Sequence, residues 1–355
     1  MNGNRLDAVR NLMEEHDIDA LLINKLVHLH YFSGFRGDDS ALLIFKDRAL
    51  LITDSRYTEQ AAAEAPDFEI ICQKDGLWKK VSECVNEGEI KVLGFESNAV
   101  LYETYEKLRK LMGQVEFKGV KLDELRQVKD EEEIALIRKA CEIADSAFLD
   151  IIEFIRPGIS EIEVAARLEQ YMRSLGSERP AFATIVASGK RGSMPHGIAS
   201  EKLIVSGEFV TMDYGAVYKG YHSDITRTIC VGKADDEQRR VYEAVLSAQL
   251  MGLSNVTAGA SGKAVDKAAR DCLKAAGLDE YFGHGLGHSL GLEIHEEPRL
   301  SPKSNCEHLL NNMLVTVEPG VYIPGWGGIR IEDTVLVKDS GGEPLTLCTK
   351  QLLEV

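Results

Sequence analysis

The second half of the chain contains an internal duplication. The segment at 155–160, Ile-Arg-Pro-Gly-Ile-Ser, recurs 101 positions later as Val-Thr-Ala-Gly-Ala-Ser at 256–261. Each serine can cap the N-terminus of a helix, and each helix is expected to end at a glycine, Gly176 in one copy and Gly277 in the other, again 101 positions apart. The sequence therefore predicts two related α/β repeats.

Four acidic residues occupy matching positions in the two repeats. They are Asp213 and Asp224 in the first repeat and Glu318 and Glu332 in the second. In each repeat one acid ends a β-rich run and the next strand carries the other, so a hairpin can bring the two carboxylates together. A single acid at a strand end is usually a solvated turn residue, but duplicated pairs favour a site. Two divalent ions would balance the charge of four converging carboxylates.

Glu332 and its neighbour Asp333 are predicted to lie on one strand over 329–337. Successive side chains of a strand point to opposite faces, so only one of the two acids can face the centre. The repeat selects Glu332, because it aligns with Asp224 when Thr334 aligns with Thr226.

A glycine-rich segment supplies histidines. Residues 283–288 read Gly-His-Gly-Leu-Gly-His, and three of the nine histidines, His284, His288 and His295, fall within 283–295. The glycines disfavour a helix, so an extended segment is predicted. Imidazole suits Mn, Co, Fe and Zn, so a histidine beside four carboxylates indicates a pair of transition-metal ions. His196, in a loop at 193–197, is weak evidence on its own.

The first third of the chain has a different pattern. Residues 1–122 alternate helical and strand patterns and predict a small α/β domain, with strands at 20–23, 41–45 and 49–52. A linker is predicted at 123–130, and a second domain at 131–355 begins with a long helix capped by Asp130 and Glu133. The predicted fold class is thus α/β (α+β), in two domains.

Composition excludes some partners. The 355 residues carry 41 basic and 57 acidic side chains, for a formal charge of −16, which opposes binding to nucleic acid or to an anionic membrane surface. No apolar run approaches the roughly 18 residues of a membrane span, and the first 20 residues are charged throughout, so a cytoplasmic location is expected. The seven cysteines are scattered and are interpreted as reduced, packed thiols.

The acids and histidines together carry a family resemblance. The ordered set Asp213, Asp224, His288, Glu318 and Glu332 resembles the five-ligand dinuclear site of the pita-bread metallopeptidases. The chain most resembles their Xaa-Pro peptidase branch, aminopeptidase P and prolidase, and the segments 24–37, 53–57 and 126–134 are similar to the amino-terminal domain and linker of that branch. The resemblance implies a creatinase-like amino-terminal domain and a pita-bread catalytic domain of two pseudo-twofold-related repeats.

The resemblance also implies roles for single residues. Asp213 would be a terminal ligand of one metal, His288 and Glu318 would bind the other, and Asp224 and Glu332 would bridge the two ions. Glu318 would also move a proton from the attacking water to the leaving nitrogen.

Further residues match supporting positions of the branch. His196, His284 and His295 match its active-site histidines, of which His284 and His295 would stabilise an oxyanion and orient substrate. Arg330 would brace the site and Tyr322 would line it. Arg299 falls where prolidases hold a substrate carboxylate, although an exposed arginine could equally be a solvated rim residue.

The implied activity is hydrolysis of an Xaa-Pro bond, in a dipeptide or at the N-terminus of a peptide, by a hydroxide shared between two divalent ions. Mn is favoured over Co, Zn or Fe, and a homodimer is expected. Three alternatives remain. A methionine aminopeptidase would lack the large amino-terminal domain, a creatinase-like C–N hydrolase would lack the ligands, and a non-catalytic binding protein would have lost some of them. Preference for dipeptides or longer peptides stays open.

Overall fold

The computed structural model describes the backbone of residues 2–355 and the side chains from Arg5 onward. The chain forms two compact units, which divide between Leu125 and Arg126. This division falls in the predicted linker, where a short 3₁₀ helix, η1, spans Asp123–Arg126. Each unit is described by itself.

The amino-terminal unit is built on a six-stranded sheet with the order β4-β3-β2-β1-β5-β6. The β1–β2 and β2–β3 pairs are antiparallel and the others are parallel. The strands are β1 (Ala20–Ile23), β2 (Ala41–Phe45), β3 (Ala49–Thr53), β4 (Glu69–Cys72), β5 (Val92–Glu96) and β6 (Glu116–Val120). The helices are α1 (Asn2–Glu15), α2 (Leu26–Ser33), α3 (Thr58–Glu64), α4 (Leu77–Glu87) and α5 (Tyr102–Met112). Every residue of β1 and β2 is buried, as expected for strands covered on both faces.

The carboxy-terminal unit begins with the predicted long helix, α6 (Glu131–Phe154). Asp130 accepts hydrogen bonds from the backbone N–H groups of Glu132 and Glu133, and the Glu133 side chain completes the capping box. The two duplicated serines also cap helices, Ser160 at α7 (Glu161–Ser174) and Ser261 at α9 (Gly262–Ala275). Helix α8 spans Asp236–Asn255.

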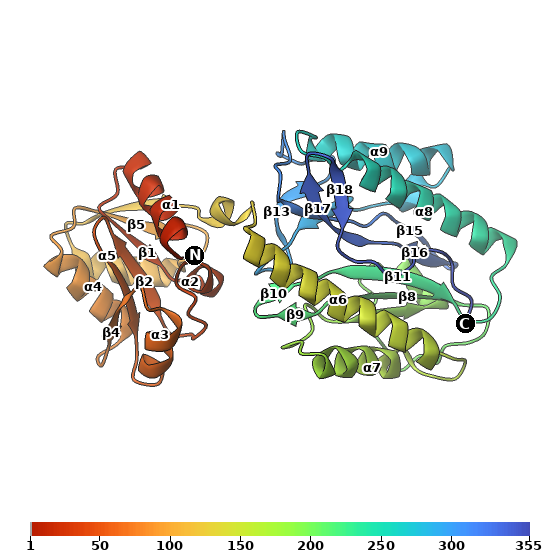
Figure 1. Ribbon diagram of the computed structural model, residues 1–355, viewed down its shortest axis with the longest axis horizontal. Helices are drawn as coiled ribbons and strands as arrows, with labels where there is room; N and C mark the ends of the chain where they lie inside the picture. Colours follow the sequence, from red (N-terminus) through yellow and green to blue (C-terminus); the bar gives the residue numbers. More distant parts are fainter. Residues whose placement is uncertain (1) are drawn as a thin grey trace. The chain divides into compact units, whose positions relative to one another are not determined.

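Strands of the two repeats lie between two helix pairs, α6 with α7 and α8 with α9 (Figure 1). The first repeat has a sheet of order β11-β8-β7, and the second has a sheet of order β14-β17-β18. Their strands are β7 (Ile185–Ser188), β8 (Phe209–Tyr214), β11 (Ile225–Cys230), β14 (Leu314–Val317), β17 (Asp333–Lys338) and β18 (Gly341–Pro344). Each helix pair packs its apolar face on the sheet of its own repeat and forms one core cluster. The predicted pair of α/β repeats is therefore confirmed.

Short strand pairs and 3₁₀ turns connect these sheets. The pairs are β9 (Val217–Tyr218) with β10 (Tyr221–His222), β12 (Gly287–Ser289) with β13 (Glu296–Leu300), and β15 (Gly320–Ile323) with β16 (Gly327–Arg330). The turns are η2 (Gly189–Ser193) and η3 (Asp279–Tyr281). The glycine-rich segment at 283–288 is not helical, as predicted; it forms an irregular stretch whose last two residues begin β12.

The single strand predicted over 329–337 is wrong. Strand β16 ends at Arg330, and β17 begins at Asp333. The chain changes partners between them: Arg330 pairs with Gly320 of β15, whereas Asp333 pairs with Val317 of β14. At the break, the backbone N–H of Glu332 donates to the carbonyl of Thr226 in the other repeat. The residue that the repeat selected thus lies where the two repeats meet.

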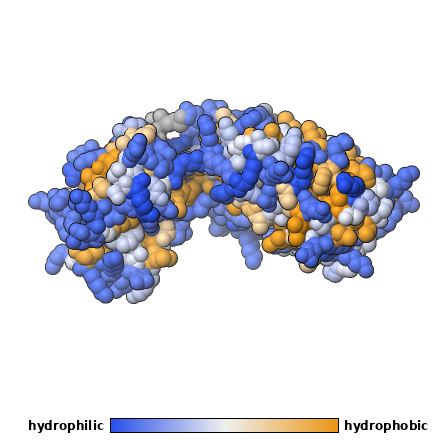
Figure 2. Space-filling model, turned by 90° about the horizontal axis from the view of Figure 1, so that it is seen from below, coloured by the Kyte–Doolittle hydropathy of each residue, from blue (hydrophilic) through white to orange (hydrophobic). Residues whose placement is uncertain are grey.

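One face of the molecule is mainly polar. Hydrophilic side chains cover most of the face shown in Figure 2, with smaller apolar patches among them, in keeping with the formal charge of −16. Within the described part of the chain, no helix combines the length and apolar character needed to cross a membrane.

Candidate active site

One cavity of the carboxy-terminal unit, about 680 Å³ in volume, is lined by all eleven residues that the sequence analysis assigned to a site. They are His196, Asp213, Asp224, His284, His288, His295, Arg299, Glu318, Tyr322, Arg330 and Glu332. The residues come from both repeats, so the fold brings the matched acids to one place.

The two hairpins hold the four acids at corresponding strand ends. Asp213 lies on β8 opposite Thr226 of β11, and Asp224 directly precedes β11. Glu318 directly follows β14, and Glu332 directly precedes β17. Single carboxylate oxygens of Asp213, Asp224 and Glu332 lie within 4.8 Å of one another. Three acids from the two repeats therefore converge closely enough to share a cation.

His288 completes the cluster from β12. Its Nε2 lies 3.5 Å from Oδ2 of Asp224 and 3.5 Å from Oε1 of Glu318. Its Nδ1 lies 3.0 Å from the carbonyl oxygen of Ser289, so Nδ1 donates and Nε2 presents a lone pair to the cluster. Burial lowers the pKa of His288 to about 3, so the ring is a neutral ligand at pH 7.

The site acids carry more negative charge than the protein balances. Burial and the neighbouring carboxylates raise the pKa values of Asp224 and Glu332 well above the ordinary range, and burial raises that of Glu318 to about 8. The buried Oδ1 of Asp213 has no hydrogen-bond partner among the described residues.

These donors fit divalent cations. Carboxylate oxygens with one imidazole match the preferences of Mn, Co, Fe and Zn, and the cations would supply the charge that the acids lack.

Two duplicated threonines connect the repeats at the acids. Thr226 of the first repeat donates from Oγ1 to Oε2 of Glu332 at 2.6 Å. Thr334 of the second repeat donates from Oγ1 to the backbone carbonyl of Asp224 at 2.8 Å. The sequence analysis used these threonines only to align the repeats, so it missed their role in holding the acids of the opposite repeat.

A chain of hydrogen bonds leads away from Asp213. Nη2 of Arg330 lies 2.5 Å from Oδ2 of Asp213, and Nη1 of Arg330 donates to the Tyr322 hydroxyl at 2.8 Å. Nε2 of His284 lies 2.8 Å from the same hydroxyl, while its Nδ1 faces the carbonyl of Gly285 at 2.8 Å. Burial lowers the pKa of His284 to about 4, so the neutral ring donates from Nδ1 and accepts from Tyr322. Both ring nitrogens of His284 are thus engaged within the protein.

The remaining predicted residues lie at the exposed side of the cavity. The rings of His295 and His288 are 4.5 Å apart, and burial together with Arg299 lowers the pKa of His295. Arg299 pairs with His288 in the β12–β13 register, but half of its side chain is exposed and its Nε lies 3.5 Å from Glu297. His196 is exposed beside Pro195. These three side chains are accessible to a bound molecule.

Sequence reasoning missed the apolar part of the cavity wall. Phe182, Ile198 and Ile294 line the cavity, and Ile198 is 59% exposed. Ile294 precedes His295 and could have been noticed from that position, but Phe182 and Ile198 carry no local signal.

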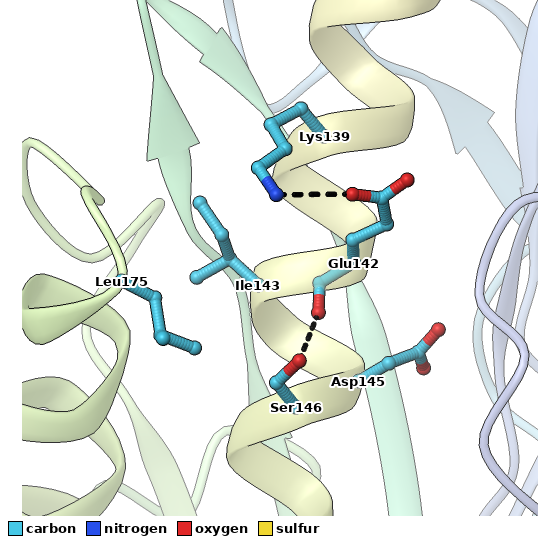
Figure 3. A pocket seen from close by; sticks show the side chains of 6 residues that line it. All are labelled: Lys139, Glu142, Ile143, Asp145, Ser146 and Leu175. Carbon is cyan, nitrogen blue, oxygen red and sulfur yellow. Dashed lines mark hydrogen bonds and ion pairs between the residues drawn. The ribbon is translucent and has the colours of Figure 1, made fainter.

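A second hollow, between α6 and the end of α7, shows a different chemistry (Figure 3). There Lys139 and Glu142 point toward each other, with Nζ and Oε2 3.1 Å apart. Asp145 accepts hydrogen bonds from the backbone N–H groups of Leu347 and Cys348. Both acids already have hydrogen-bond partners, so this hollow has no counterpart of the unpartnered Oδ1 of Asp213 in the cavity.

Fold and site together define a metal-dependent hydrolase in which two α/β repeats share one carboxylate–imidazole centre. Residues 135–339 match the model of metallopeptidase family M24, and residues 5–128 match the creatinase/prolidase N-terminal domain. The chain therefore belongs to metallopeptidase family M24. The predicted resemblance is confirmed, and the implied requirement is for divalent metal ions.

Relatives match along nearly the whole chain. The uncharacterized peptidase YqhT of Bacillus subtilis is 44% identical, over 98% of this chain and 99% of that protein. The Xaa-Pro dipeptidase of Pyrococcus furiosus is 41% identical, over 98% of this chain and 99% of its own length. Among solved structures, the Xaa-Pro dipeptidase from Bacillus anthracis has a TM-score of 0.97 at 43% identity and covers 100% of both chains.

Proposed function

We propose that this metallopeptidase is an exopeptidase that hydrolyses the Xaa-Pro bond of dipeptides or of peptide N-termini. The observation that carries the proposal is the cavity in which Asp213, Asp224, Glu318, Glu332 and His288 converge without enough cationic charge. Relatives of 41% identity are named Xaa-Pro dipeptidases, and a structural neighbour of 41% identity is named an X-Pro aminopeptidase.

We assign two divalent ions to the five residues of this cluster, with Mn as the favoured metal. When bound, such ions lower the pKa of water and polarise a carbonyl group, which is the chemistry that peptide hydrolysis needs. Glu318 would accept the proton of the attacking water and deliver it to the leaving nitrogen, since its carboxylate lies in the cavity beside His288.

The accessible histidines would contact substrate. His295 and His196 can donate to the carbonyl oxygen of the scissile bond as negative charge develops there. We assign His284 to orienting Tyr322 and Arg330, because its two nitrogens already have partners. Arg299 can reach out of the cavity toward the free carboxylate of a dipeptide.

Proline selectivity would come from the apolar wall. The nitrogen of proline in a peptide bond carries no hydrogen. An enzyme therefore cannot recognise the scissile bond by accepting a hydrogen bond from that nitrogen. Phe182, Ile198 and Ile294 supply an apolar surface on which a pyrrolidine ring can pack.

Turnover of Ala-Pro, Ala-Pro-Ala and N-acetyl-Ala-Pro by the Mn- and Co-loaded protein tests the proposal. We expect hydrolysis of at least one free substrate, none of the acetylated one, and loss of activity after exhaustive chelation. Turnover of Ala-Pro alone would assign a dipeptidase, and turnover of both free substrates an aminopeptidase. Metal binding without hydrolysis of any Xaa-Pro substrate would contradict the proposal.

Two further assignments accompany this function. We propose a cytoplasmic enzyme, since all seven cysteines are free thiols, as a reducing compartment would keep them. We also propose a homodimer, in which the amino-terminal unit contributes to assembly rather than to the chemistry. Sedimentation of the full chain and of residues 126–355 would test the assembly.

A further inference from the structure

The loop that carries His284 has an unusually permissive backbone. Gly283 and Gly285 flank the histidine; a side-chain carbon added at Gly283 would meet no atom within 4 Å, whereas one added at Gly285 would lie 2.9 Å from Cβ of Ser301. Glycine restricts backbone torsion angles less than any other residue. Neighbouring elements must therefore hold this loop if the imidazole is to keep one position.

Helix α9 provides that support through one ion pair. Asp266 and Arg270 lie one turn apart, with Nε of Arg270 2.8 Å from Oδ2 of Asp266 and Nη2 3.1 Å from Oδ1. Asp266 is only 1% exposed, and the Arg270 guanidinium lies 4.2 Å from the centre of the Phe282 ring. The pair is thus fixed by its own two hydrogen bonds and by packing.

The same ion pair binds the loop backbone on both sides of His284. Nη1 of Arg270 donates to the carbonyl of Phe282 at 2.9 Å, and Nη2 donates to the carbonyl of His284 itself. Oδ1 of Asp266 accepts from the backbone N–H of Leu286 at 3.0 Å. Three backbone groups within five residues are held by one pair of side chains.

His284 connects the loop to the cavity through a chain of hydrogen bonds. Its Nε2 accepts from Tyr322, whose hydroxyl accepts from Arg330, and Arg330 in turn binds Asp213. A displaced imidazole would therefore release Tyr322 and let Arg330 move relative to the acid.

We infer that Asp266 and Arg270 are positioning residues, which fix His284 and through it the Tyr322–Arg330 pair at the reaction centre. The inference rests on the proposed function for its kinetic part. Neither side chain is among those that line the catalytic cavity, so each acts only through the loop.

The helix offers a matched control. Lys267 and Asp271 form another ion pair one turn apart on α9, but their side chains are 71% and 59% exposed. The hydrogen bonds described for this pair stay within the helix and do not reach residues 282–286. Lys267→Met thus removes an ion pair from the same helix without touching the loop.

The main test compares Arg270→Lys and Asp266→Asn with Lys267→Met, all on the Mn-loaded enzyme with an Xaa-Pro substrate. Lysine keeps the charge but cannot bridge a carboxylate and two carbonyls with one planar group. We expect kcat to fall about tenfold or more in both loop variants, with KM changed by less than about threefold, because orientation is lost rather than binding. Unchanged kcat in Arg270→Lys would overturn the inference.

A double-mutant cycle separates positioning from general destabilisation. If Arg270 acts through His284, Arg270→Lys should lower kcat much less in a His284→Gln background than in the parent enzyme. Equal fold-losses in the two backgrounds would overturn the inference.

A spectroscopic readout does not depend on turnover. In the Zn-loaded protein, the ¹⁵N shifts of His284 should report a single Nδ1-protonated ring in the parent and in Lys267→Met, and averaged tautomers in Arg270→Lys. An unchanged His284 spectrum in Arg270→Lys would overturn the inference even if the enzyme proved inactive on Xaa-Pro substrates. Absence of turnover in the parent, with the spectral change present, would overturn the proposed function and leave the positioning role supported.

Discussion

The carboxy-terminal unit buries two sets of acids that differ in their counter-charges. In the cavity, Arg330 is the only described cation that hydrogen-bonds to the four acids, and burial holds the pKa values of Asp224 and Glu332 high. The second set, Glu296 and Asp333, lies outside this cluster and is called the framework set. Burial raises the pKa of Glu296, but its ion pairs with Lys129 and Arg126 outweigh that effect and leave the pKa below the ordinary value. Burial alone does not mark a functional acid; burial without a balancing cation does.

The contrast is sharpest between two neighbours in the chain. Glu332 faces the cavity, whereas Asp333 binds Arg227 at 2.8 Å and Lys350 at 2.5 Å. Burial raises the pKa of Asp333, but those two cations outweigh it and lower the pKa overall. One carboxylate is therefore available to a cation from solution, and the next is already neutralised by the fold.

The largest effect is expected for Glu332→Gln. Loss of a ligand charge should lower bound metal below the parent value and reduce turnover by roughly a hundredfold or more while the fold persists. Asp333→Asn should instead destabilise the protein and leave the metal content of the folded fraction unchanged. Metal analysis and kinetics on both variants measure this, and a larger loss of metal in Asp333→Asn would break the distinction between the two sets.

Breaking the framework set at Glu296 should affect stability more than metal binding. Glu296→Gln removes the carboxylate that pairs with the buried Lys129 and one of the two that pair with the buried Arg126, which keeps Glu293 at 2.6 Å, so unfolding free energy should fall by about 3 kcal/mol. Urea denaturation of the metal-loaded protein measures the change. A stability equal to that of the parent would show that Glu296 is not needed to balance these cations.

Removal of metal from the cavity acids should destabilise the folded protein. Ions that bind only the folded state stabilise it, by about 3 kcal/mol per site at a hundredfold excess over Kd, so the chelated protein should melt at a lower temperature at pH 7.5. In Glu332→Gln the difference in melting temperature between the metal-loaded and the chelated protein should be smaller than in the parent. Identical melting curves of the loaded and chelated parent would argue against a shared metal site.

A smaller, pH-dependent effect should come from Glu296. Its pKa is lowered in the folded state, so the unfolded chain binds more protons once the pH falls below the ordinary value of 4.5. The contribution of Glu296 to stability is therefore complete above that pH and is lost as the pH falls through the lower folded value. Metal-free parent protein should lose stability between pH 5 and 3 more steeply than metal-free Glu296→Gln; parallel curves would contradict the assignment.

The sequence was most informative where the groups concerned lie close together in the chain or recur in the repeat. The caps at Asp130, Ser160 and Ser261 need only residues within one turn, and both members of each acid pair belong to one hairpin. The convergence of the site acids could thus be predicted from spacing, whereas their roles come from the resemblance and stay predictions.

Side chains that pair across many positions in the chain could not be predicted from local spacing. Glu296 pairs with Arg126, 170 positions earlier, and no local pattern indicates it. The break at Ile331–Glu332 was missed because a segment rich in β-branched residues does not reveal that its two ends belong to different sheets. The Asp266–Arg270 pair resembles any surface ion pair of a helix until the loop beside it is seen.

The reciprocal threonine contacts also govern how the unit could be divided. Thr226 holds an acid of the second repeat, and Thr334 holds the backbone of an acid in the first. Fragments cut between β11 and α8 would each keep a helix pair and a sheet, yet each would expose half of a charged centre and lose the hydroxyl that orients it. Such fragments should bind metal weakly when separate and recover tight binding only when they reassociate. Metal binding at the catalytic centre would therefore stabilise the complex of the two fragments.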